Sequence, residues 1–183
     1  MGWEHIMSWE ALDHLLFIAA LTSLYSFKQW KQLLVLVTAF TFGHTLTLAL
    51  STYKIVRFNN EWIEFLIPVT IIITSIFNWV HKGKMPKKME LNYLLTLFFG
   101  LIHGMGFASA IKQMLIGTQT IVIPLLSFNL GIEAGQLVVV LLLLYLSKIM
   151  VDIIGLSQKS WTMTISLITF ILSIYFCIVR WPF

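Results

Sequence analysis

Long apolar runs limit what this chain can fold into more than any other feature of its sequence. Apolar stretches of about 20 residues recur from end to end, and about 20 residues is the length at which a helix crosses the hydrocarbon core of a bilayer. Charged residues make up 11% of the chain, whereas soluble domains contain roughly a quarter. Strands of a membrane barrel would alternate apolar and polar residues over about ten positions, and the sequence shows no such alternation. We therefore expect an all-α integral membrane protein.

Polar and turn-forming residues divide the chain into six expected transmembrane helices, which we assign to one bundle and one domain over residues 1–183. His14 and His103 are as far apart in the sequence as His44 and Glu133, and three spans separate the members of each pair. This spacing raises the hypothesis of a 3+3 inverted repeat, an arrangement that many transporters share. The expected spans are 9–27, 31–53, 62–80, 91–111, 120–147 and 160–180.

Lysine and arginine are unevenly distributed between the two ends of the expected bundle. The loops after the first, third and fifth spans hold twice as many of them as the loops and terminus at the other end. The positive-inside rule therefore predicts a multi-pass protein of the bacterial inner membrane with both termini outside the cytoplasm. Glu4 and Glu10 stand where a cleavable signal peptide would have a basic region, so we expect the first helix to act as an uncleaved insertion signal.

The cysteine count and the net charge exclude several classes of binding partner. The single cysteine, Cys177, excludes an intramolecular disulfide and a multi-cysteine metal site. The net charge of +4 comes from lysines that flank apolar segments, where they set membrane orientation, so we do not expect nucleic-acid binding. The expected partners are membrane lipid and a metal ion, with a homo-oligomer or an accessory subunit as open alternatives.

Five ionisable side chains fall inside the expected spans, where each costs at least about 2.5–3.5 kcal/mol on insertion scales. A rise of about 1.5 Å per residue places all five in the outer half of the bilayer. A single intramembrane histidine is as consistent with helix packing as with metal ligation, but five such groups on four helices favour one shared polar site. They are Asp13 and His14 in the first span, His44 in the second, His103 in the fourth and Glu133 in the fifth.

The neighbours of these five residues suit a packed interior. His44 is surrounded by threonines in "TAFTFGHTLTLALS", and His103 lies within a GxxxG pattern in "GLIHGMGFA", which lets helix backbones approach closely. Asn129, Glu133 and Gln136 recur at helical spacing and form one polar stripe. Asp13 also allows a simpler reading as a wet interfacial residue.

The charges of the five groups suggest a cation. Two carboxylates and three neutral imidazoles carry a net charge that a divalent ion would neutralise, and this ligand mixture suits nickel, zinc, cobalt, iron or copper. We therefore predict an intramembrane metal site for a divalent transition metal. Its expected ligands are Asp13, His14, His44, His103 and Glu133, with His5, Asn129 and Gln136 as additional candidates.

Four segments of the chain resemble the hydrogenase and urease accessory membrane proteins of the HupE/UreJ family. They are "LDHLLFIAAL", "FTFGHTLTLAL", "GLIHGMGFA" and "FNLGIEAGQ", and they fall in four of the six spans. The resemblance implies a small multispan protein tied to nickel supply, regarded as a nickel or cobalt permease. It also implies functional roles at Asp13, His14, His44, His103 and Glu133.

The first of these segments departs from the family pattern. Well-known members have a histidine, five residues and then Asp-His, whereas here seven residues separate His5 from Asp13. Met7 and Ser8 stand near the matching position, and neither is a strong ligand for nickel. The resemblance therefore does not assign His5, and it leaves the metal open.

Three functions fit this sequence. The leading hypothesis is a transition-metal permease in which carboxylates attract the cation and imidazoles replace its water shell. The rival is an intramembrane zinc-dependent hydrolase that uses the same cluster, with one carboxylate as general base. The third is a structural metal-binding subunit of a larger membrane complex. No nucleotide-binding loop is present, so transport would be passive, proton-coupled or driven by a partner.

Overall fold

The computed structural model describes residues 2–8, 11–56, 59–81, 84, 89–107, 111 and 121–183, and this part of the chain contains helices and no strand. The all-helical class is therefore confirmed. The helices are α1 (Gly2–Met7), α2 (Leu12–Thr22), the 3₁₀ turn η2 (Phe27–Gln29), α3 (Trp30–Thr52), α4 (Asn60–Val80), α5 (Met89–Gly106), α7 (Val122–Lys148), the π-helical turn η3 (Ile149–Ile153) and α8 (Gln158–Val179).

Four segments of the described chain are long and apolar enough to cross a membrane. They are Phe27–Thr52, Asn60–Val80, Val122–Ile153 and Gln158–Val179. These correspond to the second, third, fifth and sixth expected spans, so the multi-pass character is supported. The expected starts at 9 and 120 lie outside the described residues. The full count of six spans and the inverted repeat remain predictions.

The first expected span, 9–27, differs from the helix that forms there. The helix α2 has 11 residues and ends at Thr22, which gives it a length of about 16 Å, roughly half the hydrocarbon thickness. Its end is fixed from another helix, because Gln158 and Thr162 of α8 both donate to the carbonyl of Ser23, at 2.9 and 2.7 Å. These bonds satisfy a carbonyl that a helix end otherwise leaves unpaired.

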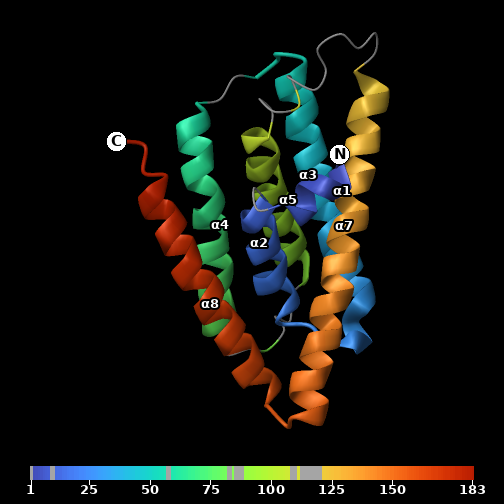
Figure 1. The fold of residues 1–183 in the computed structure, drawn as a ribbon, viewed down its shortest axis with the longest axis vertical. Coiled ribbons are helices and arrows are strands. Elements are labelled where there is room, and N and C mark those ends of the chain that lie inside the picture. Colours follow the sequence, from blue (N-terminus) through green and yellow to red (C-terminus); the bar gives the residue numbers. More distant parts are fainter. Residues whose placement is uncertain are drawn as a thin grey trace.

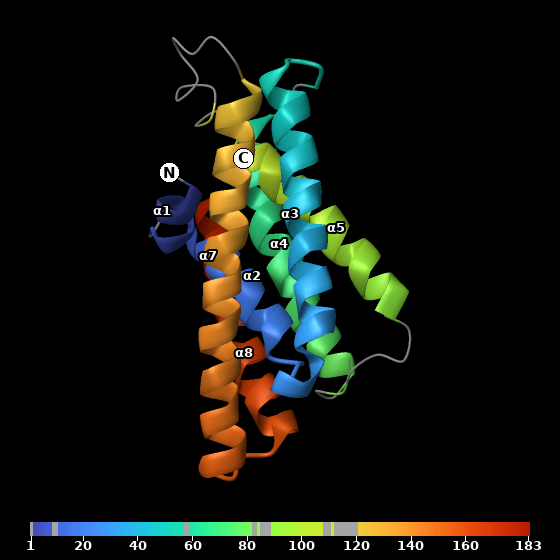
Figure 2. The same ribbon diagram turned by 90° about the vertical axis from the view of Figure 1, so that its right-hand side faces the viewer.

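The short helix α2 lies in the middle of the bundle, and the longer helices surround it in both views (Figures 1 and 2). It packs against α4, α7 and α8, and Phe17, Ile18 and Leu21 contribute to the largest buried cluster. A helix that is apolar on all sides is expected to be buried in this way. The residues at its start are therefore held within the protein.

Glycines bring two helix pairs into close contact. A side chain at Gly100 or Gly104 of α5 would collide with the backbone of Phe40 or His44 on α3, and one at Gly43 would collide with α5. The GxxxG pattern in this segment thus serves helix packing. Similarly, Gly131 of α7 contacts the backbone at the start of α1, which lies beside α7 in Figures 1 and 2.

A buried histidine cluster as a candidate metal centre

Four histidines from four helices gather where α1 and the start of α2 meet α3 and α5. The ring of His14 on α2 lies at the centre, with ring centroids 4.9 Å from His103, 5.8 Å from His44 and 5.4 Å from His5. The side chains of His44 and His103 have no exposed surface, and His14 is buried as well. The structure therefore brings together the three histidines predicted for the site and adds His5.

The helix packing described above sets the positions of these rings. Gly104 lies directly against the backbone of His44. This close approach also fixes the position of the preceding residue, His103, relative to α3. Thr47 of α3 donates to the carbonyl of Leu101 on α5 at 2.8 Å. This bond opposes sliding of α3 and α5 along each other. The cluster is thus built on regular helices, which position ligands more rigidly than loops do.

The amide of Asn129 determines which nitrogen of His44 carries the proton. Asn129 donates through Nδ2 to the carbonyl of Leu125 at 2.8 Å, so its Oδ1 faces Nδ1 of His44 at 3.3 Å. An amide oxygen only accepts, and Nδ1 of His44 must therefore be the donor. The lone pair of His44 is left on Nε2.

Thr70 fixes the opposite tautomer at His103. The hydroxyl of Thr70 donates to the carbonyl of Ile67 at 2.7 Å, and its oxygen lies 3.1 Å from Nε2 of His103. Since the one hydroxyl proton is used on Ile67, Nε2 of His103 donates to Thr70. The lone pair of His103 is therefore on Nδ1.

Each of the four imidazoles has a buried nitrogen that finds no hydrogen-bond partner among the described residues. Buried polar atoms are paired in the great majority of cases, so four unpaired nitrogens in one cluster are unusual. For His44 and His103, the unpaired atom is the one that carries the lone pair. The four atoms are Nε2 of His5, Nε2 of His14, Nε2 of His44 and Nδ1 of His103.

The carboxylate of Asp13 forms an ion pair with the guanidinium of Arg180. Its Oδ2 accepts a hydrogen bond from Nη1 of Arg180 at 2.6 Å, and its other oxygen, Oδ1, is buried with no partner in the described part of the chain. Asp13 is buried and also lines a cavity together with Arg180. Its position beside His14 keeps it next to the cluster.

Glu133 is hydrogen-bonded to a residue outside the four rings. Its Oε1 accepts a hydrogen bond from Thr38 at 2.8 Å on the flank where α3 and α7 meet, and its side chain is partly exposed. Its neighbours on the predicted stripe face inward, since Asn129 contacts His44 and Gln136 accepts from Thr41 at 2.9 Å. The amides of Asn129 and Gln136 therefore form hydrogen bonds with residues of α3.

A cavity of about 370 Å³ opens beside the cluster. Three of the four histidines and Asp13 line it, and it also reaches an exposed carboxylate, Glu64 of α4. This cavity gives the cluster access from the end of the bundle where α8 terminates. Its lining residues are His5, Asp13, His14, Glu64, Ile67, His103, Gly106, Phe107 and Arg180.

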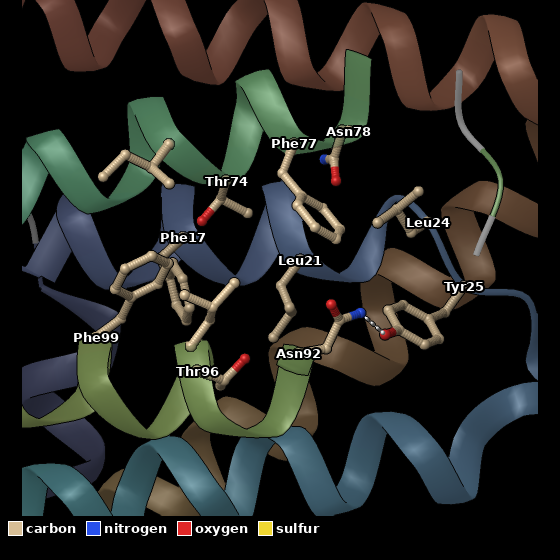
Figure 3. Close-up of a pocket in the computed structure, with 12 residues that line it drawn as sticks. Phe17, Leu21, Leu24, Tyr25, Thr74, Phe77, Asn78, Asn92, Thr96 and Phe99 are labelled. Carbon is tan, nitrogen blue, oxygen red and sulfur yellow. Dashed lines mark hydrogen bonds between the residues drawn. The ribbon is translucent and has the colours of Figure 1, made fainter. Parts of the chain in front are cut away.

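A second, smaller pocket lies on the other side of an aromatic layer. Phe17 stacks on Phe40 with a centroid distance of 4.9 Å and meets Phe99 edge-on at 5.9 Å, and the rings of Phe17 and Phe40 both contact the ring of His103. Beyond Phe17 and Phe99, Figure 3 shows Thr74, Asn92 and Thr96 facing the pocket. With a volume of about 30 Å³, it has room for a water molecule.

The rings of the cluster touch edge to face and do not converge on one point. Accordingly, no three His, Cys, Asp or Glu side chains within the described ranges are arranged to hold a metal ion. Ligation needs side-chain rotation that brings ring nitrogens to about 2.0–2.1 Å from a zinc-sized cation. The donor set itself, neutral imidazoles with a carboxylate alongside, is chemically suited to such ions.

Two residues of this site were not predicted as such from the sequence. Arg180 entered only the count of charges that sets orientation, and Thr70 is one of several hydroxyls in apolar helices. An arginine that follows an apolar span is a weak signal on its own, because the same pattern arises wherever a helix leaves the membrane. Its pairing with Asp13 depends on how α8 packs in the bundle.

Comparison with known protein families supports the resemblance. The family model described as "HupE / UreJ protein" matches residues 1–180 of the chain. This confirms the resemblance carried by the four segments, including those that contain His14, His44 and His103. No curated protein and no solved structure is significantly similar to the chain.

Proposed function

Because the chain belongs to the HupE/UreJ family, whose members are membrane accessory proteins for nickel and cobalt handling, we propose that it is a permease for a divalent transition metal of the nickel type. The observation that carries this proposal is the set of four buried imidazole nitrogens without a partner among the described residues. We propose His14, His44 and His103 as the central ligands, with His5 completing the set.

The two cavities give the proposal a route. The larger cavity, which reaches Asp13 and three of the histidines, receives the hydrated cation from the outer side of the inner membrane. Imidazole nitrogens then replace part of its water shell, and the tautomers of His44 and His103 leave a lone pair available on each ring without a proton transfer. The aromatic layer of Phe17, Phe40 and Phe99 separates this site from the smaller pocket, through which the cation leaves toward the cytoplasm.

The donor set favours transport over tight retention. Neutral imidazoles bind borderline cations well. However, the rings must rotate before they ligate, and the free energy of this rotation lowers the affinity. A permease needs this balance, since a site that holds its ion too firmly does not conduct. In this proposal Glu133, which is bonded to Thr38, is not one of the ligands.

The experiment is metal binding and uptake with the purified full chain. Titration with Ni²⁺, Co²⁺ and Zn²⁺ in lipid nanodiscs measures affinity, and uptake of the same ions into proteoliposomes measures transport. We expect His14→Ala and His103→Ala to abolish both. His81→Ala is a matched control, because His81 caps the far end of α4, where its Nδ1 lies 2.9 Å from the carbonyl of Phe77.

Two outcomes would contradict the proposal. One zinc ion per chain that survives chelation and purification would indicate a structural or hydrolytic site. Normal uptake by the His103→Ala protein would show that the route does not pass through the cluster.

A further inference from the structure

Arg180 places a permanent positive charge inside the cavity that leads to the histidine cluster. It follows the last turn of α8, and its guanidinium lies over the ring of Phe176 at 5.0 Å from the centroid. Its Nη1 donates to Oδ2 of Asp13 at 2.6 Å. Arg180 is thus held by a ring on its own helix and by a carboxylate on α2.

This charge opposes the entry of a cation unless it moves. Arg180, Asp13, His14 and His103 line the same cavity of about 370 Å³, and like charges in a partly buried space repel each other strongly. Without a cation, however, Asp13 would be a buried carboxylate lacking a counter-charge, which is costly. Arg180 supplies that counter-charge while the site is empty.

The ion pair leaves room for exchange. The contact joins one guanidinium nitrogen to one carboxylate oxygen, and Oδ1 of Asp13 has no partner among the described residues. A cation that reaches the cavity can therefore meet Oδ1 while Oδ2 is still paired. About a quarter of the Arg180 side chain is exposed, so its guanidinium has space into which it can withdraw.

The same cavity contains a second carboxylate for the displaced group. Glu64 of α4 lines it and is exposed, and α4 packs along α8, the helix that Arg180 terminates. A move from Asp13 to Glu64 keeps the arginine paired in both states. One cavity thus offers two positions for one tethered cation.

We propose that Arg180 is a tethered cation that competes with the incoming metal ion for Asp13, so that metal entry releases Arg180 toward Glu64. This inference rests on the proposed function and identifies Arg180 as a residue that sets the affinity of the protein for the metal ion. Tight binding is limited because the metal must displace a cation that the chain itself provides.

The test titrates Ni²⁺ into the full chain in nanodiscs for the wild type, Arg180→Gln and Arg180→Lys. We expect Arg180→Gln to bind Ni²⁺ about tenfold more tightly, within the 5–150-fold range of typical coupling, because the competitor is gone. Arg180→Lys keeps the charge and should bind with nearly wild-type affinity. The double variant Asp13→Asn with Arg180→Gln should lose the gain, since the contested carboxylate is absent.

A second measurement uses the wild-type side chain and does not depend on the folding of a variant. Phenylglyoxal modifies accessible guanidinium groups, and peptide mass spectrometry reports Arg180 separately from Arg57. We expect Ni²⁺ to increase the modification rate of Arg180 and leave that of Arg57 unchanged. Mg²⁺, which imidazoles bind poorly, serves as the control ion.

The outcomes separate the two proposals. If Ni²⁺ binds but Arg180→Gln binds it equally or more weakly, or if Ni²⁺ protects Arg180 from modification, Arg180 is a structural partner of Asp13 and the inference fails while the permease proposal stands. If neither the wild type nor any variant binds Ni²⁺, Co²⁺ or Zn²⁺, the proposed function fails and this inference fails with it.

Discussion

Thr70 on α4 accepts a hydrogen bond from His103 on α5 at 3.1 Å, and this bond determines which nitrogen of His103 is available to a cation. The direction is fixed because the threonine proton is already donated to Ile67. A partner outside the ligand set thus prepares a ligand inside it, as is usual for imidazoles at metal sites.

Replacement of Thr70 by valine should weaken metal binding. Thr70→Val keeps the shape of the side chain but removes the acceptor, so His103 loses the bond that holds its tautomer and orientation. We expect affinity for Ni²⁺ to fall about 10–100-fold, the range for partners of metal-ligating histidines, in a nanodisc titration. Thr74→Val is the matched control, because Thr74 bonds only to the carbonyl of Thr70 among the described groups; an equal loss there would refute the assignment.

Asn129 should support metal binding by His44 in the same way, and a conservative variant of Asn129 should restore the binding that its removal weakens. Asn129→Leu removes the oxygen that accepts from Nδ1 of His44, and we expect a similar loss of Ni²⁺ affinity. Asn129→Asp retains an acceptor at that position and should restore most of the binding. If leucine and aspartate behave alike, the amide has only a packing role.

Gly104 should be intolerant of even a methyl group. A side chain there would meet the backbone oxygen of His44 and the hydroxyl of Thr47, so α3 and α5 would have to move apart. We expect Gly104→Ala to lower the free energy of unfolding by about 1–3 kcal/mol, as overpacking typically does, in a denaturant titration in detergent. Ala134→Leu, at an exposed position on α7, should have little effect, and equal losses would contradict the close approach.

Phe17 should control passage without controlling binding. Phe17→Ala opens the aromatic layer beneath the cluster, so we expect faster and less selective uptake into proteoliposomes with Ni²⁺ affinity changed less than about threefold, well below the loss from removing a supporting hydrogen bond. Phe42→Ala is the control, because that ring is 64% exposed on the outer face of α3. An unchanged uptake rate in Phe17→Ala would place the route elsewhere.

Glu133 distinguishes the ligand set expected from sequence from the one proposed here. The sequence stripe suggests that it joins the histidines, whereas it accepts a hydrogen bond from Thr38 on the flank of the bundle. We expect Glu133→Gln to change Ni²⁺ affinity by less than about threefold, far below the 10–100-fold losses expected above. A loss as large as that of His103→Ala would return Glu133 to the site.

The sequence predicted the parts of this molecule that depend on composition and short spacings. Apolar runs identified four helices that are long and apolar enough to cross a membrane, and the cost of a buried imidazole singled out His14, His44 and His103, because such residues need a reason to be there. The glycines around His103 correctly indicated close helix packing, since small residues at this spacing have few other uses.

Features that depend on the tertiary fold could not be read in advance. The helix expected to run to residue 27 ends at Thr22, where α8 supplies bonds to Ser23, a contact between distant segments. His5 was ambiguous because it belongs to a six-residue helix that folds back onto α7. Glu133 shares a sequence stripe with Asn129 and Gln136, yet a rotation of about 40–60° around the helix, from the 100° step per residue, separates its direction from theirs.

The short length of α2 has an electrical consequence. Because this helix spans about half the hydrocarbon thickness, with a cavity at its start and a small, mainly apolar pocket beside it, the proposed route would cross the membrane voltage over a short distance around the aromatic layer. A field focused in this way acts on a cation mainly during one step. Each elementary charge that crosses exchanges about 2.3 kcal/mol with the field per 100 mV, so for a divalent ion on the proposed route the step past the aromatic layer would carry roughly twice that amount.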